Sequence, residues 1–136
     1  MDDCIFCKII KGEIPCHKVY EDDQVLAFLD ISPVSKGHTL VIPKEHTDNL
    51  MTMSAEQINQ VFQVAQKVAQ KLDEALKPDG FNLGMNNKPA AGQVVFHAHV
   101  HVMPRSKDDG LELWHQHYNY QENEVEELVK KLINQA

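Results

Sequence analysis

Histidine and apolar residues alternate over positions 96–103, and this pattern constrains the fold of the chain more than any other feature. In a β-strand successive side chains point to opposite faces of the sheet, so every second residue shares a face. Residues 94–103 are therefore expected to form a strand, with His97, His99 and His101 in one polar row. The residues between them are expected to point into a core: Phe96, Ala98, Val100 and Val102.

Four further strands are predicted from short apolar runs bounded by turn residues. They span residues 17–21, 24–29, 38–43 and 81–85. An acidic turn joins the first two as a β-hairpin. Residues 86–93 are expected to be the loop that leads into the histidine strand.

The clearest helix is predicted to begin after Ser54. Ser54 as N-cap and Gln57 three residues later form a capping box, and apolar residues then recur at helical spacing until Pro78 ends the run. Short helices are also expected at residues 4–10 and 124–134. The second of these is expected to bury its apolar residues: Val125, Leu128, Val129, Leu132 and Ile133.

Together these elements indicate an α+β fold, with a mainly antiparallel five-stranded sheet, one long helix and one or two short ones. The 136 residues are expected to form a single domain, 1–136. A formal net charge of -7 argues against a general nucleic-acid binder, which needs many basic side chains to meet phosphates. No segment has the run of about 18 apolar residues that a membrane span needs.

Three cysteines, Cys4, Cys7 and Cys16, all lie near the start of the sequence. Their odd number, and an acidic start unlike a signal peptide, favour a reducing compartment, so the protein is expected to be cytoplasmic. Cys4 and Cys7 form a C-x-x-C pair. On its own this pair fits zinc binding, redox chemistry or coincidence.

The histidine row has two chemical interpretations besides a plain solvated face. Three imidazoles can bind a zinc ion that keeps an open position for catalysis. Alternatively, one imidazole attacks phosphorus while a neighbour handles a proton, which suits a group whose ordinary pKa is about 6.5. The turn before the row, residues 90–93, contains Gly92 and would let backbone N–H groups approach a phosphate. It favours the second interpretation.

Residues 97–103 resemble the signature of the histidine triad (HIT) family: His, apolar, His, apolar, His, apolar, apolar. The resemblance is closest to the branch of small nucleoside phosphoramidases (HINT-type), in a bacterial form with a zinc site. It covers residues 4–105 and leaves 106–136 as a C-terminal tail and helix. Other blocks resemble the family in the same order: 5–10, 13–15, 28–31, 37–43 and 92–93.

This resemblance implies a hydrolase or transferase that works through a covalent nucleotidyl-histidine. Its substrates would be purine nucleoside 5′-phosphoramidates, related adenylated compounds or dinucleoside polyphosphates. By their positions in the motifs, His99 would be the nucleophile, and His101 would bind the phosphate and assist proton transfer. The other residues matched to the reacting groups are His38, Gln93, Asn86 and Gly92.

For the nucleoside, the resemblance implies that Asp30 holds the ribose hydroxyls, a role that suits a carboxylate acceptor. Phe6, Ile9, Phe28 and Ile31 would form the apolar pocket for the base. Val94 departs from relatives that carry a polar residue there, which affects the expected leaving group rather than the reaction class.

The resemblance also implies that catalysis needs no metal, while a structural zinc is held by Cys4, Cys7, His46 and His97. Two thiolates and two imidazoles would close a tetrahedral site. Relatives of this kind are two-fold homodimers, so a homodimer is expected. The alternatives are a nucleotide-binding or scaffolding protein with incidental hydrolysis, and zinc-dependent hydrolysis through the histidine row.

Overall fold

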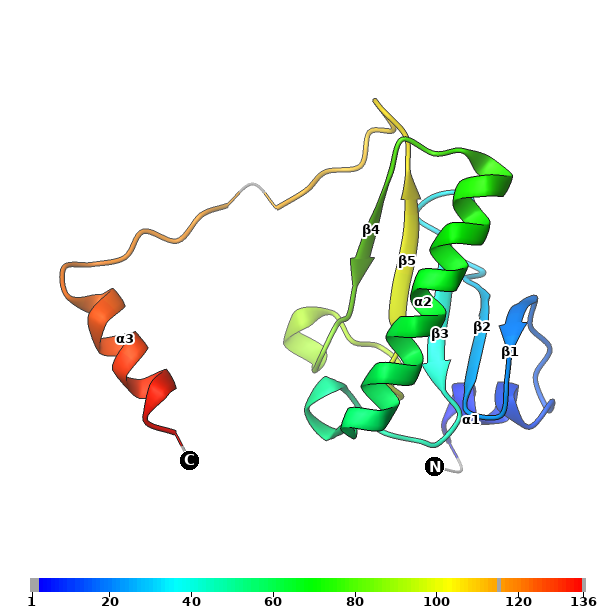
Figure 1. Cartoon of the computed structure of the whole chain (residues 1–136), viewed down its shortest axis with the longest axis horizontal. Coiled ribbons are helices and arrows are strands. Elements are labelled where there is room, and N and C mark those ends of the chain that lie inside the picture. Colours follow the sequence, from blue (N-terminus) through cyan, green and yellow to red (C-terminus); the bar gives the residue numbers. More distant parts are fainter. Residues whose placement is uncertain (1–2, 115, 136) are drawn as a thin grey trace.

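The computed structural model describes residues 3–114 and 116–135. Its centre is an antiparallel sheet with the strand order β1-β2-β3-β5-β4 (Figure 1). The strands span Lys18–Glu21 (β1), Val25–Leu29 (β2), Thr39–Pro43 (β3), Gly80–Gly84 (β4) and Val100–Arg105 (β5). The predicted α+β class and five-stranded sheet are confirmed.

The long helix α2, Ala55–Leu76, covers one face of the sheet. As predicted, Ser54 caps it in a capping box with Gln57. The helix ends where Lys77 adopts a left-handed conformation just before Pro78. Its apolar stripe packs on every second residue of the central strands, which form one core cluster with it: Val25, Ala27, Val41, Val100 and Val102.

The opposite face of the sheet carries the short helix α1, Ile5–Ile10. Phe6 and Ile9 of this helix pack on the strand residues that point away from α2: Leu26, Phe28, Leu40 and Ile42. Because alternation assigns Val100 and Val102 to the α2 face, His101 between them points to the α1 face. The sheet therefore separates the main apolar core from the histidines.

The strand that carries the histidines is shorter than predicted. It begins at Val100, so only His101 lies within it, and the backbone at His97 and His99 is irregular. Residues 94–99 lack the continuous strand neighbours that β3 and β4 give to β5. Alternation still persists: Ala98 is buried in the α2-side core, and both histidine rings contact Phe6 on the other side. Phe96 does not follow it and is half exposed, against expectation.

The C-terminal helix α3, Glu124–Ile133, forms as predicted but buries none of its residues. Residues 106–114 and 116–123 form no helix or strand and belong to an arm that carries α3 away from the sheet (Figure 1). The expectation that Val125 and its neighbours are buried is therefore wrong for the single chain. No helix within residues 3–114 and 116–135 is long and apolar enough to cross a membrane.

Candidate active site and metal centre

A hydrogen bond at Nδ1 of His99 determines which nitrogen of the ring carries the lone pair. Its Nδ1 lies 2.7 Å from the backbone carbonyl oxygen of His97, and a carbonyl only accepts. Nδ1 therefore carries the proton, and in the neutral ring the lone pair is on Nε2. Phe6 packs edge-on against this ring with 5.1 Å between centroids, and the side chain is buried. The site thus holds a neutral imidazole whose lone pair is on Nε2.

A second pair of histidines is ordered in the same way. The backbone N–H of Val34 donates to Nδ1 of His38 at 3.1 Å, so the proton of the neutral ring is on Nε2. That Nε2 lies 2.8 Å from Nδ1 of His101 and donates to it. The proton of His101 is then on its own Nε2. This nitrogen is buried and has no hydrogen-bond partner in the described part of the chain.

Burial keeps all these rings neutral. It lowers the pKa of His101 to about 4, with a smaller effect of the neighbouring His99 and His38. Burial also lowers the pKa of His99 and of His38 below the ordinary value, while the carboxylate of Asp30 opposes both shifts. At neutral pH the cluster is a set of oriented donors and acceptors without positive charge.

Asp30 lies beside this cluster at the end of β2. One of its oxygens accepts the backbone N–H of Ser32 at 2.8 Å, and the other lies 3.6 Å from Nε2 of His38. Asp30, His38 and His101 come close enough to bind a metal ion together. The hydrogen bond from Val34 opposes this, because it leaves the proton of His38 on the nitrogen that would face the ion.

The loop before the histidines is tied together by Gln93. Its amide nitrogen donates to the carbonyls of Asp48 at 2.6 Å and Val95 at 3.0 Å, and its oxygen accepts the N–H of Lys88 at 2.7 Å. Gly92 has a φ of +95°, which favours glycine, and a side chain there would meet the amide of Asn86.

The backbone N–H groups of this turn are not free for a ligand, contrary to expectation. Ala91, Gly92 and Gln93 all donate to carbonyls within the turn itself, because the segment closes as the short 3-10 helix η2, Pro89–Ala91.

The expected base-pocket residues divide into two groups. Phe6 and Ile9 of α1 are buried together with Phe28 of β2. The rings of Phe6 and Phe28 are in edge contact, with 5.5 Å between centroids. Ile31 is 89% exposed, beside Asp30. Only Ile31 offers a large free apolar surface, while the other three form a rigid floor.

A hollow of about 440 Å³ opens beside the histidine pair on the β4 side. His38, His101 and Asn86 line one part of it, and the C-terminal arm lines another through Leu111 and Trp114. The matched motif blocks include no residue of this part of the wall. Trp114 follows the matched blocks, and no pattern in residues 106–123 signals its position.

The four expected metal ligands meet at the N-terminus of α1. Nδ1 of His97 lies 3.3 Å from Sγ of Cys4 and 3.6 Å from Sγ of Cys7, and Nδ1 of His46 lies 3.4 Å from Sγ of Cys7. Zinc at its usual bond lengths spaces sulfur and nitrogen ligands about 3.5 Å apart around a tetrahedron. The cluster therefore has the spacing of a zinc site and can bind a metal ion.

The outer nitrogens of both imidazoles are held by acceptors. Nε2 of His97 donates to the carbonyl of Pro43 at 2.7 Å, and Nε2 of His46 faces a carboxylate oxygen of Asp48 at 3.0 Å. Each Nδ1 is then free to coordinate, as metal-binding histidines require. Sequence reasoning missed Asp48, although its spacing of two residues from His46 was a usable signal.

Burial raises the pKa of the Cys7 thiol to about 11, and the nearby Cys4 adds to the effect. A bound cation would reverse this by favouring the thiolate. Cys16 stays outside the cluster, in the core beneath α1, as expected.

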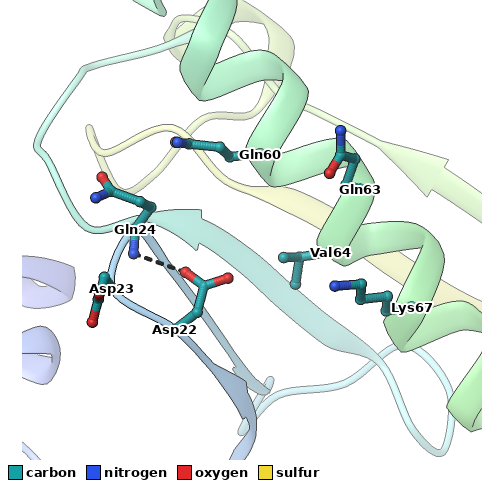
Figure 2. A pocket seen from close by; sticks show the side chains of 7 residues that line it. All are labelled: Asp22, Asp23, Gln24, Gln60, Gln63, Val64 and Lys67. Atoms are coloured by element: carbon teal, nitrogen blue, oxygen red, sulfur yellow. Dashed lines mark hydrogen bonds between the residues drawn. The ribbon is translucent and has the colours of Figure 1, made fainter.

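Figure 2 shows a different hollow, of about 340 Å³, between the β1–β2 turn and α2. It lies on the α2 side of the sheet, away from the histidines. Asp22 at its edge is engaged in the turn, where it accepts the backbone N–H groups of Gln24 and Val25. We assign it no function.

The model of the HIT domain matches residues 11–108 of this sequence. The chain belongs to the HIT family. The resemblance seen in the histidine motif is confirmed, and the oriented histidines described above are those of a HIT domain.

Several named relatives are similar to this chain over most of its length. The chain is 51% identical over 118 residues to "Protein hit" of Bacillus subtilis, covering 85% of this chain and 81% of that one. It is 40% identical over 130 residues to adenosine 5′-monophosphoramidase hnt1 of Schizosaccharomyces pombe, covering 95% of both. It is 44% identical over 110 residues to adenylylsulfatase HINT3 of Arabidopsis thaliana, covering 81% of this chain and 56% of that one.

Solved structures agree with the fold. The crystal structure of SMU.412c from Streptococcus mutans superimposes with a TM-score of 0.92 at 47% identity, over 98% of this chain and 85% of that one. A HIT family protein from Bacillus anthracis gives 0.89 at 47% identity, over 98% and 96%. A zinc-bound histidine triad protein from Mycobacterium smegmatis gives 0.78 at 41% identity, over 85% and 84%.

Proposed function

We propose that this HIT protein is a nucleotidyl hydrolase or transferase that cleaves purine nucleoside 5′-phosphoramidates and related adenylated compounds. The reaction passes through a nucleotide bound covalently to His99. The observation that carries the proposal is the hydrogen bond from His99 Nδ1 to the His97 carbonyl, because it leaves Nε2 as a neutral nucleophile. The names of two relatives, an adenosine 5′-monophosphoramidase and an adenylylsulfatase, support the substrate class.

In the first step, Nε2 of His99 attacks the α-phosphorus. A nitrogen–phosphorus bond forms, and the bond from phosphorus to the leaving nitrogen or oxygen breaks. The imidazole becomes positively charged, and the carbonyl of His97 at 2.7 Å stabilises this charge through the Nδ1–H. The leaving group departs with the electron pair of the broken bond and takes up a proton.

His101 is the group best suited to supply that proton. Its unpaired Nε2–H can donate to the phosphate or to the leaving atom. A bound phosphate raises the pKa of His101, because a nearby negative charge favours the protonated ring, so the ring takes up a proton from solvent when substrate binds and becomes neutral again when it gives one to the leaving group. In the second step a water molecule attacks phosphorus, gives a proton back to His101 and releases the nucleotide from His99. His38 is a positioning residue that fixes the orientation of His101.

The nucleoside is proposed to bind between Asp30 and the apolar floor under α1. The carboxylate accepts from the ribose hydroxyls, and Ile31 covers the base against Phe6, Ile9 and Phe28. Asn86 stands on the leaving-group side, where it lines the hollow beside His101. Gln93 and Gly92 shape this loop, since the amide of Gln93 is engaged by backbone groups.

A structural zinc ion is proposed at Cys4, Cys7, His46 and His97. With all four positions filled by protein ligands, the ion would bind no water and would tie α1 to the histidine segment. No step of the reaction at His99 passes through it. The zinc-bound relative from Mycobacterium smegmatis supports the identity of the metal.

The protein is proposed to be a homodimer in the cytoplasm. β4 is an edge strand and presents an unpaired backbone, and Leu83 on it is exposed. A second sheet could extend this edge. A reducing compartment suits the three free thiols, two of which must stay reduced to bind zinc.

Trapping the covalent intermediate tests the proposal. The intact protein is mixed with a slow adenosine phosphorothioate substrate, quenched, digested and analysed by mass spectrometry. We expect the added mass on the peptide that contains His99, together with steady turnover of adenosine 5′-phosphoramidate. A protein that only binds nucleotides would show affinity without an adduct and without turnover.

A further inference from the structure

The C-terminal arm and α3 present apolar surface that the rest of the described chain does not cover. Val129 is 45% exposed and Ile133 is 73% exposed, on a helix in which no residue is buried. Val125, Leu128 and Leu132 share that exposed surface. These residues recur at helical spacing and form a stripe, which is the pattern of a helix that packs against another surface.

A helix of ten residues is not stable on its own in water, because nucleation is costly and few hydrogen bonds follow. α3 also lacks a side-chain hydrogen bond at its N-cap, Asn123. Its charges do favour the helix, with three acids in the first turn and two lysines in the last. Most of its stability must nevertheless come from packing of the apolar stripe, so α3 needs a surface to dock on.

The position of the arm recurs in solved relatives. The structures from Streptococcus mutans and Bacillus anthracis match 98% of this chain with TM-scores of 0.92 and 0.89. An arm that pointed elsewhere in those crystals would either fall outside the match or lower the score. The arm therefore takes a similar course in two different crystallised proteins, and a molecule that both crystals supply in many copies is the chain itself.

The length and the charge of the arm are compatible with docking on a second copy of the chain. Residues 106–123, if fully extended, span up to about 60 Å, which is enough to leave one domain and cross a neighbour. The acidic first turn of α3 disfavours nucleic acid and anionic membrane surfaces. The arm leaves the body beside β4, whose open edge is the proposed dimer contact, so it starts next to a second copy.

We propose that α3 docks on a second copy of this chain, so that the two subunits of the dimer exchange their C-terminal arms. Residues 111–114 of the arm remain at the hollow beside His38 and His101, while α3 is anchored on the neighbour. The wall of each candidate active site is then held in place by the other subunit. This extends the proposed homodimer and does not depend on the chemistry of His99.

Two measurements on the full-length protein test this. Equal amounts of ordinary and ¹⁵N-labelled chain are unfolded together, refolded with zinc and treated with a lysine-specific crosslinker. Crosslinks from Lys130 or Lys131 to lysines of the body are then sorted by isotope. We expect about half of these pairs to be mixed. Hydrogen exchange of the α3 amides, measured on the same sample, is expected to be at least about tenfold slower than for an unfolded peptide.

The outcomes are distinct. Protected α3 amides without any mixed pair mean that α3 folds onto its own chain, and unprotected amides mean that it does not dock. Either result overturns the proposal, while turnover of adenosine 5′-phosphoramidate reports separately on the proposed function.

A matched pair of variants locates the contact on the apolar stripe. Val129→Asp changes the charge by one unit on the stripe, and Lys130→Gln makes the same change on the polar side of the helix. We expect the first to remove the protection of α3 and the second to keep it, with the sheet folded in both. Equal protection in the two variants contradicts docking through the stripe.

Discussion

Nδ1 of His99 and the carbonyl oxygen of His97 lie 2.7 Å apart, and this contact joins the two candidate centres of the molecule. The ring of His97 faces the cysteines, whereas its backbone oxygen faces the proposed nucleophile. Contacts that hold the ring of His97 in place therefore also hold the peptide carbonyl that orients His99.

Removal of the proposed nucleophile is expected to stop the reaction. His99→Ala should lower kcat/KM for adenosine 5′-phosphoramidate by at least about a thousandfold, because the covalent bond to His99 can no longer form. Steady-state assays check this, with His117→Ala as the control, since His117 is an exposed histidine of the arm. Activity of His99→Ala within tenfold of the wild type would end the assignment.

Loss of one cysteine ligand is expected to release the metal. We expect elemental analysis to find one zinc per wild-type chain, and Cys7→Ser should abolish it and lower Tm by several degrees, because the proposed tie from α1 to His97 is lost. Cys16→Ser is the matched control and should keep the metal, since Cys16 lies outside the cluster. Zinc retained at full occupancy by Cys7→Ser would show that the four residues do not bind it as proposed.

The acid limit of activity is expected to lie below pH 6.5. His99 attacks only when neutral, and burial lowers its pKa from that ordinary value, so protonation sets in at lower pH than for a free histidine. The logarithm of kcat/KM plotted against pH should be flat from 7.5 down to 6.5 and fall below that. A fall that begins above pH 7 would contradict a buried neutral nucleophile.

Stability is expected to decrease over the same acid range. The pKa of His101 is about 4 in the fold and about 6.5 when unfolded, so the unfolded chain takes up a proton first. The contribution of His101 is complete above pH 6.5 and is lost as the pH falls toward 4, by at most about 1.4 kcal/mol per pH unit. Urea unfolding of the wild type and of His101→Asn over this pH range separates the contribution of His101 from that of the metal ligands. An identical pH dependence of stability in the two proteins would refute the contribution of His101.

The carboxylate of Asp30 is expected to act on the ribose. Asp30→Asn should raise KM roughly tenfold or more for a ribonucleoside substrate, because hydrogen bonds to a charged acceptor are stronger than those to a neutral one. The effect should be smaller for a 2′-deoxy substrate, which lacks one of the hydroxyls. Asp23→Asn, an exposed acid in the β1–β2 turn, is the control. An equal rise in KM for both sugars would exclude this role.

Local rules were sufficient to predict much of the fold. The N-cap of α2 at Ser54, its end before Pro78 and the alternation that separates Val100 from His101 all depend on neighbouring residues in the chain. The start of β5 could not be predicted in this way. It depends on where β3 and β4 stop providing partners, and that is a property of the assembled sheet.

The sequence proposes the members of the candidate site but not the contacts between them. The motif resemblance gave the histidines, and the structure brings His46 and His97 to the two cysteines as expected. The contacts of Val34 with His38 and of Gln93 with Asp48 join residues through backbone atoms, which carry no sequence signal. The exposed apolar stripe of α3 shows the same limit of sequence-based prediction. Helical periodicity indicates that this face packs against another surface, but it does not indicate which molecule provides that surface.

His97 uses its ring for one centre and its main-chain oxygen for the other, and only the first depends on the identity of the side chain. Evolution can therefore change the two properties separately. A lineage that replaces His97 gives up the proposed metal ligand but keeps a carbonyl beside His99.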